Sequence, residues 1–218
     1  MNLNEKAKRL SEESFIGFQP EDFDRGGREQ FIYLLREGLH PDSKVVDIGC
    51  GVLRAGYWLI HFLNPGCYFG IEPHTGRLDM GKHQILEPEI IESKRPNFDT
   101  NPDFNTSVFQ EKFDIFLLYS IWTHAAKAGI EATLDSFVRD ASPNAVFLTS
   151  YLPASEKHPD YLGENWVGSS HESTTRGCIH HSPEWIREIC ENRKLEVVEL
   201  PPDKTYGMNW LAIRRKTD

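Results

Sequence analysis

The chain has 218 residues, of which 39% are hydrophobic and 26% charged, a composition that suits one globular domain with a substantial core. Its formal net charge is −9 and its largest basic cluster is Arg214-Arg215-Lys216, so nucleic acid is not expected as a partner. The pattern of apolar residues predicts neither a membrane helix nor a secretory signal. Four cysteines without a C-x-x-C pair favour a reduced, cytoplasmic protein.

The first half of the chain alternates between helical and strand-like patterns. A polar, helix-prone segment at 4–14 leads through a stretch rich in Pro, Asp and Gly to residues 28–38, whose apolar positions recur at helical spacing. A β-branched run at 44–48 ends in Gly-Cys-Gly, which is typical of a buried strand before a tight turn. The next expected elements are a helix at 53–63, a strand at 67–71, a helix at 76–91 with a kink near Pro88, and a short strand near 97–100.

The second half continues the alternation and then interrupts it. A strand is expected at 113–119, a helix at 130–141 that is closed by a turn at Ser142-Pro143-Asn144, and a strand at 145–150. Residues 151–181 are rich in Pro, Gly, Ser and His, and we expect a loop or lid there. Ser182 and Pro183 then form a good helix start, and two strands at 195–200 and 208–214 are close enough to pair antiparallel.

This order of elements predicts the fold class. Strands that alternate with helices form parallel sheets with helices on both faces. We therefore expect an α/β fold, a three-layer Rossmann-like sandwich with a mostly parallel seven-stranded sheet and an antiparallel strand pair at its C-terminal end. Residues 1–27 are expected to form an N-terminal extension, and residues 28–218 one domain with its insertion at about 151–181.

A glycine turn and an acid on the following strand predict a nucleoside site. Gly49 and Gly51 let the backbone of a strand-to-helix turn approach a ligand closely, and the helix that follows offers unpaired N–H groups. Glu72 ends the next strand, where a carboxylate can accept hydrogen bonds from ribose hydroxyls. The dinucleotide fingerprint needs a glycine where this chain has Arg54, so an adenosine-type ligand is favoured over NAD.

Several segments, taken in order, are similar to the motifs of one enzyme family. The run Val45-Val46-Asp47-Ile48-Gly49-Cys50-Gly51, the acid Glu72, the pair Asp103-Phe104 and the run Ser120-Ile121-Trp122-Thr123-His124 resemble motifs of the class I S-adenosylmethionine-dependent methyltransferases. Leu53 stands where that family has a third glycine. The resemblance covers roughly residues 28–150 and 180–214.

The resemblance implies S-adenosylmethionine as the cofactor and a set of residues that hold it. The implied cofactor-binding residues are Asp47, Gly49, Cys50, Gly51, Glu72, Asp103, Phe104 and Ser120. Within this set the two glycines would line the methionine moiety, Asp47 would organise its amino-group side, Glu72 would hold the ribose, and Asp103 would accept from the adenine amine. Asp99 is a near competitor of Asp103.

The sequence indicates less about the methyl acceptor than about the cofactor. His124 follows the fourth expected strand and is a candidate general base or acceptor contact, with a histidine at a helix start as the alternative. The expected reaction is methyl transfer to a small-molecule or glycan hydroxyl. The alternatives are a catalytically silent module that binds the cofactor, and an NAD-type binding protein. The sequence leaves open whether the protein is a monomer or a homodimer.

Histidines near a cysteine raise the question of a metal site. The residues concerned are His158, His171, Cys178, His180 and His181. They lack a second pair of ligands at metal-binding spacing, so no metal is expected. An acceptor-facing or solvated role in the insertion is favoured instead.

Overall fold

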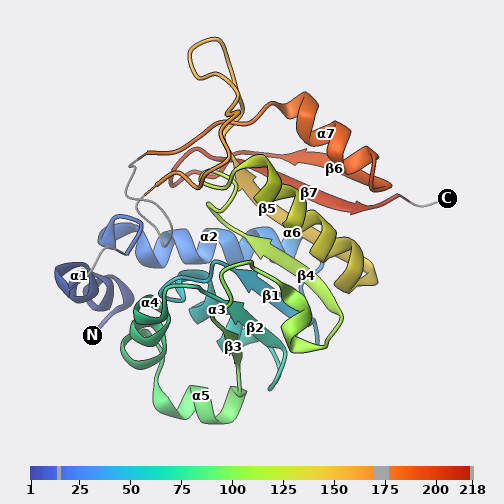
Figure 1. Ribbon diagram of the computed structural model, residues 1–218. Coiled ribbons are helices and arrows are strands. Elements are labelled where there is room, and N and C mark those ends of the chain that lie inside the picture. The colour runs from blue at the N-terminus through green and yellow to red at the C-terminus, as the bar shows by residue number, and fades with distance from the viewer. Residues whose placement is uncertain (14–15, 169–176, 217–218) are drawn as a thin grey trace. The chain divides into compact units, whose positions relative to one another are not determined.

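The computed structural model describes residues 1–13, 16–168 and 177–216 (Figure 1). The chain divides into two compact units, residues 1–104 and 105–218. None of the helices within the described ranges is both long and apolar enough to cross a membrane.

Unit 1 contains three parallel strands in the order β3-β2-β1. In chain order its elements are α1 (Leu3–Glu13), the 3₁₀ helix η1 (Pro20–Asp22), α2 (Phe23–Arg36), β1 (Val45–Ile48), α3 (Arg54–Phe62), β2 (Tyr68–Ile71), α4 (Thr75–Met80), the π-helix η2 (Gly81–Ile85), α5 (Pro88–Lys94) and β3 (Asn97–Asp99). Every residue of β1 and β2 is buried, as expected for central parallel strands. The register pairs Asp47 with Gly70 and Ile71 with Asp99, so the carboxyl ends of all three strands meet at one edge.

Helix α2 begins at Phe23, five residues before the start that the sequence predicted. The added residues include Gly26 and Gly27, and glycine is unfavourable inside helices. Both glycines are buried, and a Cβ on Gly27 would meet the backbone oxygen of Arg54 and lie 3.1 Å from Trp58 Cδ1. The absence of side chains thus lets α2 approach α3 closely, and this packing outweighs the low helix propensity.

The N-terminal helix packs next to the glycine turn that follows β1. Ala7 and Leu10 of α1 belong to a buried cluster with Phe23 of α2, Val52 after the turn and Ile85 of η2. Lys6 adds a hydrogen bond from Nζ to the Ile85 carbonyl oxygen and an ion pair with Glu87, both at 2.8 Å. Residues before 28 therefore contribute to the core of unit 1.

The single helix expected at 76–91 is three segments. Helix α4 gives way to the π-helix η2 at Gly81, where a Cβ would lie 2.8 Å from Leu53 Cγ and 2.9 Å from the Val52 carbonyl carbon. Pro88 then starts α5, a position where proline is favoured. The helical periodicity was identified correctly, but close packing at Gly81 and the ring of Pro88 interrupt the hydrogen-bond ladder.

The described residues of unit 2 form four strands in the order β4-β5-β7-β6. In chain order its elements are the 3₁₀ helix η3 (Thr106–Phe109), β4 (Phe113–Leu118), α6 (Lys127–Asp140), β5 (Ala141–Tyr151), α7 (Pro183–Glu191), β6 (Leu195–Leu200) and β7 (Asn209–Arg215). Strands β4 and β5 are parallel, whereas β7 runs antiparallel to both β5 and β6. The predicted N-cap of α7 is confirmed, because Ser182 Oγ accepts a hydrogen bond from the Trp185 N–H at 3.1 Å.

The predicted turn at Ser142-Pro143-Asn144 is wrong. Strand β5 starts at Ala141 directly after α6, and its register to β4 shifts between the pairs Phe113–Ala141 and Ile115–Val146. The extra residues of β5 form a bulge, a place where a proline costs no ladder hydrogen bond. Ser142 Oγ donates to Asp114 at 2.6 Å and holds the bulge to β4.

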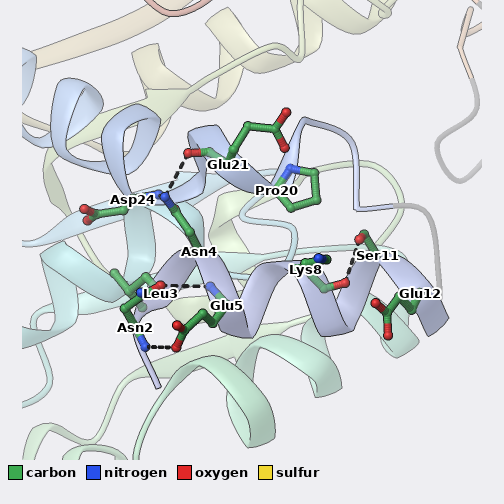
Figure 2. A pocket seen from close by; sticks show the side chains of 10 residues that line it. All are labelled: Asn2, Leu3, Asn4, Glu5, Lys8, Ser11, Glu12, Pro20, Glu21 and Asp24. Carbon is green, nitrogen blue, oxygen red and sulfur yellow. Dashed lines mark hydrogen bonds between the residues drawn. The ribbon is translucent and has the colours of Figure 1, made fainter.

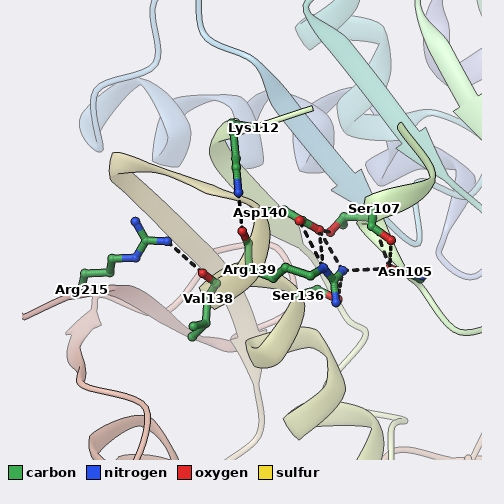
Figure 3. Close-up of polar contacts among 9 residues, drawn as sticks. Asn105, Ser107, Lys112, Ser136, Val138, Arg139, Asp140 and Arg215 are labelled. Atoms are coloured by element: carbon green, nitrogen blue, oxygen red, sulfur yellow. Dashed lines mark hydrogen bonds and ion pairs between the residues drawn. The ribbon is translucent and has the colours of Figure 1, made fainter. Parts of the chain in front are cut away.

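The end of α6 is fixed by a buried carboxylate (Figure 3). Asp140 accepts a hydrogen bond from Thr106 Oγ1 at 2.6 Å and from Arg139 Nη2 at 2.8 Å, and Arg139 also reaches Asn105. Arg215 of β7 donates to the Val138 carbonyl oxygen at 2.9 Å. These contacts join η3, the last turn of α6 and the end of β7.

The described part of the insertion is attached to α6 and to the start of α7. Asp160 accepts from Lys127 Nζ at 2.6 Å and from the Ser182 N–H at 2.8 Å. His181 is fully buried, and its Nε2 lies 3.1 Å from the Ala125 carbonyl oxygen. Isolated bridges pair Pro153 with His181 and Asp160 with His180. Of the insertion, residues 169–176 lie outside the described ranges, His171 among them.

The fold class predicted from the sequence is confirmed. The chain is α/β and Rossmann-like, and its described residues form seven strands that are mainly parallel, with an antiparallel arrangement at the C-terminal end.

We expect Gly27→Ala to lower the free energy of unfolding by about 1–3 kcal/mol, because the new Cβ would overlap the backbone of α3. Urea unfolding followed by circular dichroism measures the change. Gly129→Ala is the matched control, since Gly129 is exposed in α6 and a Cβ there makes only ordinary contact, so it should raise stability by about 0.5–1 kcal/mol. Equal stability of Gly27→Ala and wild type would show that the α2–α3 contact is not tight.

We expect the stability of the protein to decrease as the pH falls from 7.5 to 5.5, in part through His181. Burial lowers the pKa of His181, so the imidazole is neutral in the folded state and takes up its proton at higher pH when unfolded. Its contribution is complete above about pH 6.5 and is lost as the pH falls toward the lowered folded pKa. His181→Gln should flatten the pH dependence of the unfolding free energy by up to about 1 kcal/mol. The exposed His83→Gln serves as the control, and the same pH slope in His181→Gln and wild type would contradict this role.

Candidate functional site

The turn after β1 has a strained, open backbone. Gly49, Gly51 and Leu53 have φ angles of +73°, +56° and +64°, so three of five consecutive residues are left-handed. The N–H groups of Gly49 and Cys50 both donate to the Ile71 carbonyl oxygen, at 2.8 and 3.1 Å, which anchors the turn to the end of β2. Within the described part of the chain, no atom beyond the neighbouring residues lies within 4 Å of the position that a Cβ on Gly51 would take. The turn is therefore fixed at its base and open beside Gly51.

Glu72 connects this turn to the start of α4. Its carboxylate accepts a hydrogen bond from the Gly51 N–H through Oε2 and one from the His74 N–H through Oε1, both at 2.9 Å. The side chain is 4% exposed. Each carboxylate oxygen has lone pairs for a further donor, so the same group can hold the turn and accept from a ligand.

Asp47 is buried beneath the turn and is hydrogen bonded to a tyrosine. The Tyr68 hydroxyl donates to Asp47 Oδ2 at 2.8 Å, and Asp47 is 4% exposed. Burial raises the pKa of Asp47 to about 7, and the nearby Glu72 carboxylate adds to this, while the Tyr68 hydrogen bond and Arg54 oppose it. The carboxyl therefore exchanges its proton near neutral pH.

Cys50 contributes backbone to the turn and packs its side chain inside. A Cβ on Gly70 would lie 3.0 Å from the Cys50 sulfur and 3.0 Å from Phe98 Cδ1, so the thiol occupies a closely packed place between strands. Burial raises the pKa of the Cys50 thiol well above its ordinary value, which keeps it protonated and unreactive.

Arg54 turns back toward the N-terminal helices. Its guanidinium carbon lies 4.3 Å from the centre of the Phe18 ring, and its side chain fills the space beside Gly26. Arg54 thus packs against the N-terminal segment of unit 1.

The adenine-side residues occupy different surroundings. Asp103 is exposed, whereas Phe104 is buried with a φ of +53°. The competitor Asp99 ends β3, where its carboxylate accepts from the N–H and the side-chain amide of Asn101, and its carbonyl oxygen accepts from the Glu72 N–H at 3.1 Å. Asp99 is thus bonded within its own loop, while Asp103 faces solvent.

Ser120 and His124 lie in unit 2, at and after the end of β4. Ser120 has a φ of +60°; its N–H donates to Ser150 Oγ at 2.7 Å, and its hydroxyl lies 2.9 Å from that of Thr123. The imidazole of His124 lies 2.7 Å through Nδ1 from the Val167 carbonyl oxygen and stacks on Trp166 with ring centres 5.7 Å apart. A carbonyl oxygen only accepts, so Nδ1 carries the hydrogen and the lone pair is on Nε2, the tautomer that a general base needs.

The structure brings five of the predicted cofactor residues together in unit 1. They are Asp47, Gly49, Cys50, Gly51 and Glu72. Sequence reasoning missed Tyr68 and the capping residue His74, whose Nδ1 accepts from the Arg77 N–H at 3.2 Å. The available signal for Tyr68 was a tyrosine on a fully buried strand, because its hydroxyl needs a partner there.

A groove of about 770 Å³ lies along α1, η1 and the start of α2 (Figure 2). Most of its lining residues have polar side chains, among them four carboxylates and one lysine, and the full lining is Asn2, Leu3, Asn4, Glu5, Lys8, Ser11, Glu12, Pro20, Glu21 and Asp24. None of the predicted cofactor residues lines it. Over the described ranges, no group of three or more His, Cys, Asp or Glu side chains could hold a metal ion.

Comparison with known proteins identifies the fold. No family model matches the chain. It is similar to magnesium protoporphyrin IX methyltransferase (ChlM) from Synechocystis PCC 6803 with bound SAM, at 16% identity and a TM-score of 0.63, over 97% of this chain and 90% of that one. The DhpI–SAH complex matches at 12% identity and a TM-score of 0.64, over 99% and 94% of the two chains. The glycopeptide N-methyltransferase MtfA with S-adenosyl-L-methionine matches at 14% and 0.63, over 88% and 94%. At these identities the likeness concerns the fold alone, and the chain has the class I S-adenosylmethionine-dependent methyltransferase fold.

Proposed function

We propose that this protein transfers a methyl group from S-adenosylmethionine to a hydroxyl group of a small molecule or glycan. The observation that carries the proposal is the bond between the glycine turn and the Glu72 carboxylate at the ends of β1 and β2. Solved proteins of the same fold are described with SAM or SAH bound.

The residues of unit 1 suit the cofactor. The open space beside Gly51 would accept a ligand next to backbone, and Glu72 retains acceptor capacity for hydroxyl donors. Asp47 and Glu72 place two carboxyl groups beneath and beside the turn, which suits a ligand that carries positive charge. Asp103, Phe104 and Ser120 stay proposed contacts for the remainder of the cofactor.

When bound, S-adenosylmethionine supplies a methyl group on a sulfonium, which is already a good leaving group. The protein then needs to align the acceptor and to exclude water rather than to activate the methyl group. A hydroxyl acceptor must also lose its proton as it attacks, so it profits from a base. We propose His124 Nε2 as that base, because Val167 and Trp166 hold the imidazole in the tautomer and orientation that the role requires.

The acceptor class rests on this histidine and not on the fold. The matched proteins are named for a porphyrin and for a glycopeptide nitrogen, so the fold accommodates different acceptors. An amine acceptor that is neutral when it attacks needs no general base. A catalytically silent module that only binds the cofactor needs no base either. A cytoplasmic location and the choice between monomer and homodimer stay predictions.

We expect purified protein to bind S-adenosylmethionine with a micromolar Kd, about −8 kcal/mol, by isothermal titration calorimetry. Glu72→Gln should weaken binding about tenfold or more, because an amide offers one acceptor oxygen where the carboxylate offers two. Glu21→Gln, in the polar groove, is the matched control and should bind as wild type does. Absence of binding to both S-adenosylmethionine and its demethylated product would reject the cofactor assignment.

We expect His124→Asn to bind the cofactor normally and to lose methyl transfer by about 10²–10⁴-fold, because asparagine keeps a donor for Val167 but is not a base. The measurement incubates wild type and variant with isotopically methyl-labelled cofactor and panels of hydroxyl and amine acceptors, with mass spectrometry of the products. An undiminished rate in the variant would exclude the base role. Cofactor binding without transfer to either panel would favour the silent module.

A further inference from the structure

A tyrosine hydroxyl lies in the interior of unit 1, beneath the glycine turn. Tyr68 is the first residue of β2 and is 2% exposed, and its hydroxyl donates to Asp47 Oδ2 at 2.8 Å. It also interacts with the Cys50 thiol. Burial and the neighbouring Asp47 carboxyl raise the pKa of Tyr68 well above its ordinary value, so the phenol stays protonated and remains a donor.

The fold makes room for this hydroxyl. A Cβ on Gly56 of α3 would lie 2.7 Å from the Tyr68 oxygen, so the glycine is what allows the phenol to reach Asp47. A phenylalanine at this position would fill the same space without the bond. The hydrogen bond to Asp47 is therefore what the Tyr68 hydroxyl adds between β1 and α3, beyond the packing of the ring.

The charged groups around Asp47 act in opposite directions. The Glu72 carboxylate raises its pKa, the Arg54 guanidinium lowers it, and the Tyr68 hydroxyl lowers it by donating to the ionised form. The Cys50 thiol is protonated and adds no charge. Without the tyrosine, burial and Glu72 would keep the carboxyl protonated over a wider range of pH.

We infer that Tyr68 is a positioning residue that keeps Asp47 able to ionise, so that binding of the positively charged cofactor releases a proton from Asp47. The inference rests on the proposed function, because it names a proton equilibrium within the same cofactor site. The O–H bond of the Asp47 carboxyl breaks, its proton passes to solvent, the carboxylate stays hydrogen bonded to the Tyr68 hydroxyl, and no other covalent bond of the protein changes.

The direction of the pH effect follows from linkage. A cation near Asp47 favours the carboxylate and lowers the pKa of Asp47 below its value of about 7 in the free protein. When the pH is below the pKa of Asp47 in the free protein, the Asp47 carboxyl must ionise before the cofactor binds, so the affinity for the cofactor is weaker. When the pH is above this pKa, the affinity for the cofactor is constant. The affinity for the cofactor therefore rises between pH 6 and 8, by at most about tenfold per pH unit for one proton.

The test is isothermal titration calorimetry of S-adenosylmethionine into the intact protein at pH 6, 7, 8 and 9. Parallel titrations at pH 7 in two buffers of different ionisation enthalpy count the protons released. We expect wild type to bind about tenfold more tightly at pH 8 than at pH 6 and to release a fraction of one proton at pH 7. Asp47→Asn should bind without this pH step, and it also serves to subtract any titration of the cofactor itself.

Tyr68→Phe separates positioning from packing. It should weaken binding about three- to tenfold at pH 7, move the midpoint of the pH step up by about one unit, and approach wild-type affinity at pH 9. A purely structural role would weaken binding equally at every pH, and this outcome would overturn the inference. Tyr57→Phe, which removes a partly buried hydroxyl on α3 outside the site, is the matched control and should leave the midpoint unchanged.

A second measurement uses the free protein. The ¹³C chemical shift of the Asp47 carboxyl carbon should titrate near pH 7 in wild type and at higher pH in Tyr68→Phe, and an unchanged midpoint would overturn the inference. If the tyrosine variant fails to fold, the wild-type proton count decides, since release of no proton at pH 7 also overturns it. Absence of cofactor binding at every pH would instead reject the proposed function, whereas binding that does not depend on pH rejects the inference alone.

Discussion

The carboxylate of Glu72 accepts hydrogen bonds from the Gly51 and His74 N–H groups, and these bonds join three pieces of unit 1. The turn after β1, the end of β2 and the start of α4 each place an N–H or a carboxylate at the same edge of the strands. A left-handed backbone at Gly49, Gly51 and Leu53 is stable here because both ends of the turn are held, by Glu72 and by the Ile71 carbonyl oxygen. The shape of the candidate site depends on this one side chain.

Two buried acids lie close together in this site, and the protein stabilises them differently. Glu72 accepts two backbone N–H groups, from Gly51 and His74. Asp47 accepts from the Tyr68 hydroxyl, and burial raises the pKa of Asp47 to about 7. The charge of Arg54 acts on Asp47 and that of Arg77 acts on Glu72, and the Arg54 side chain packs on Phe18 and fills the space beside Gly26. Two carboxyl groups next to the glycine turn suit a ligand that brings its own positive charge.

In unit 2, backbone carbonyl oxygens of segments distant in the sequence hold the side chains of His124 and His181. Val167 of the insertion orients His124, and Ala125 next to His124 accepts from the buried His181 at the other end of the insertion. The His124–Val167 backbone bond and the Ile179–Thr123 backbone bond add to this attachment. Both ends of the described insertion are therefore bonded to the segment after β4, where the proposed base lies.

Local sequence patterns were enough to predict the order and type of most elements, the glycine turn, and the acid at the end of β2. These features are local: hydrophobic periodicity, glycine at a tight turn and a cap such as Ser182 act over a few residues. Local patterns did not predict the start of α2, the three segments of 76–91 or the bulge in β5. In those places packing against Arg54, Val52 and Asp114 overrode local propensity.

The hydrogen bonds that hold the candidate site could not be predicted from local patterns, because they join residues that are far apart in the chain. Glu72 is hydrogen bonded to Gly51, Asp47 to Tyr68 and His124 to Val167. The two residues of each pair are 21 or more positions apart in the sequence. Such contacts depend on strand register and on which glycine leaves room for which side chain, as Gly56 does for the Tyr68 hydroxyl. The residue types that a site needs can be recognised from short sequence motifs. Their protonation and orientation follow from neighbours that folding brings together.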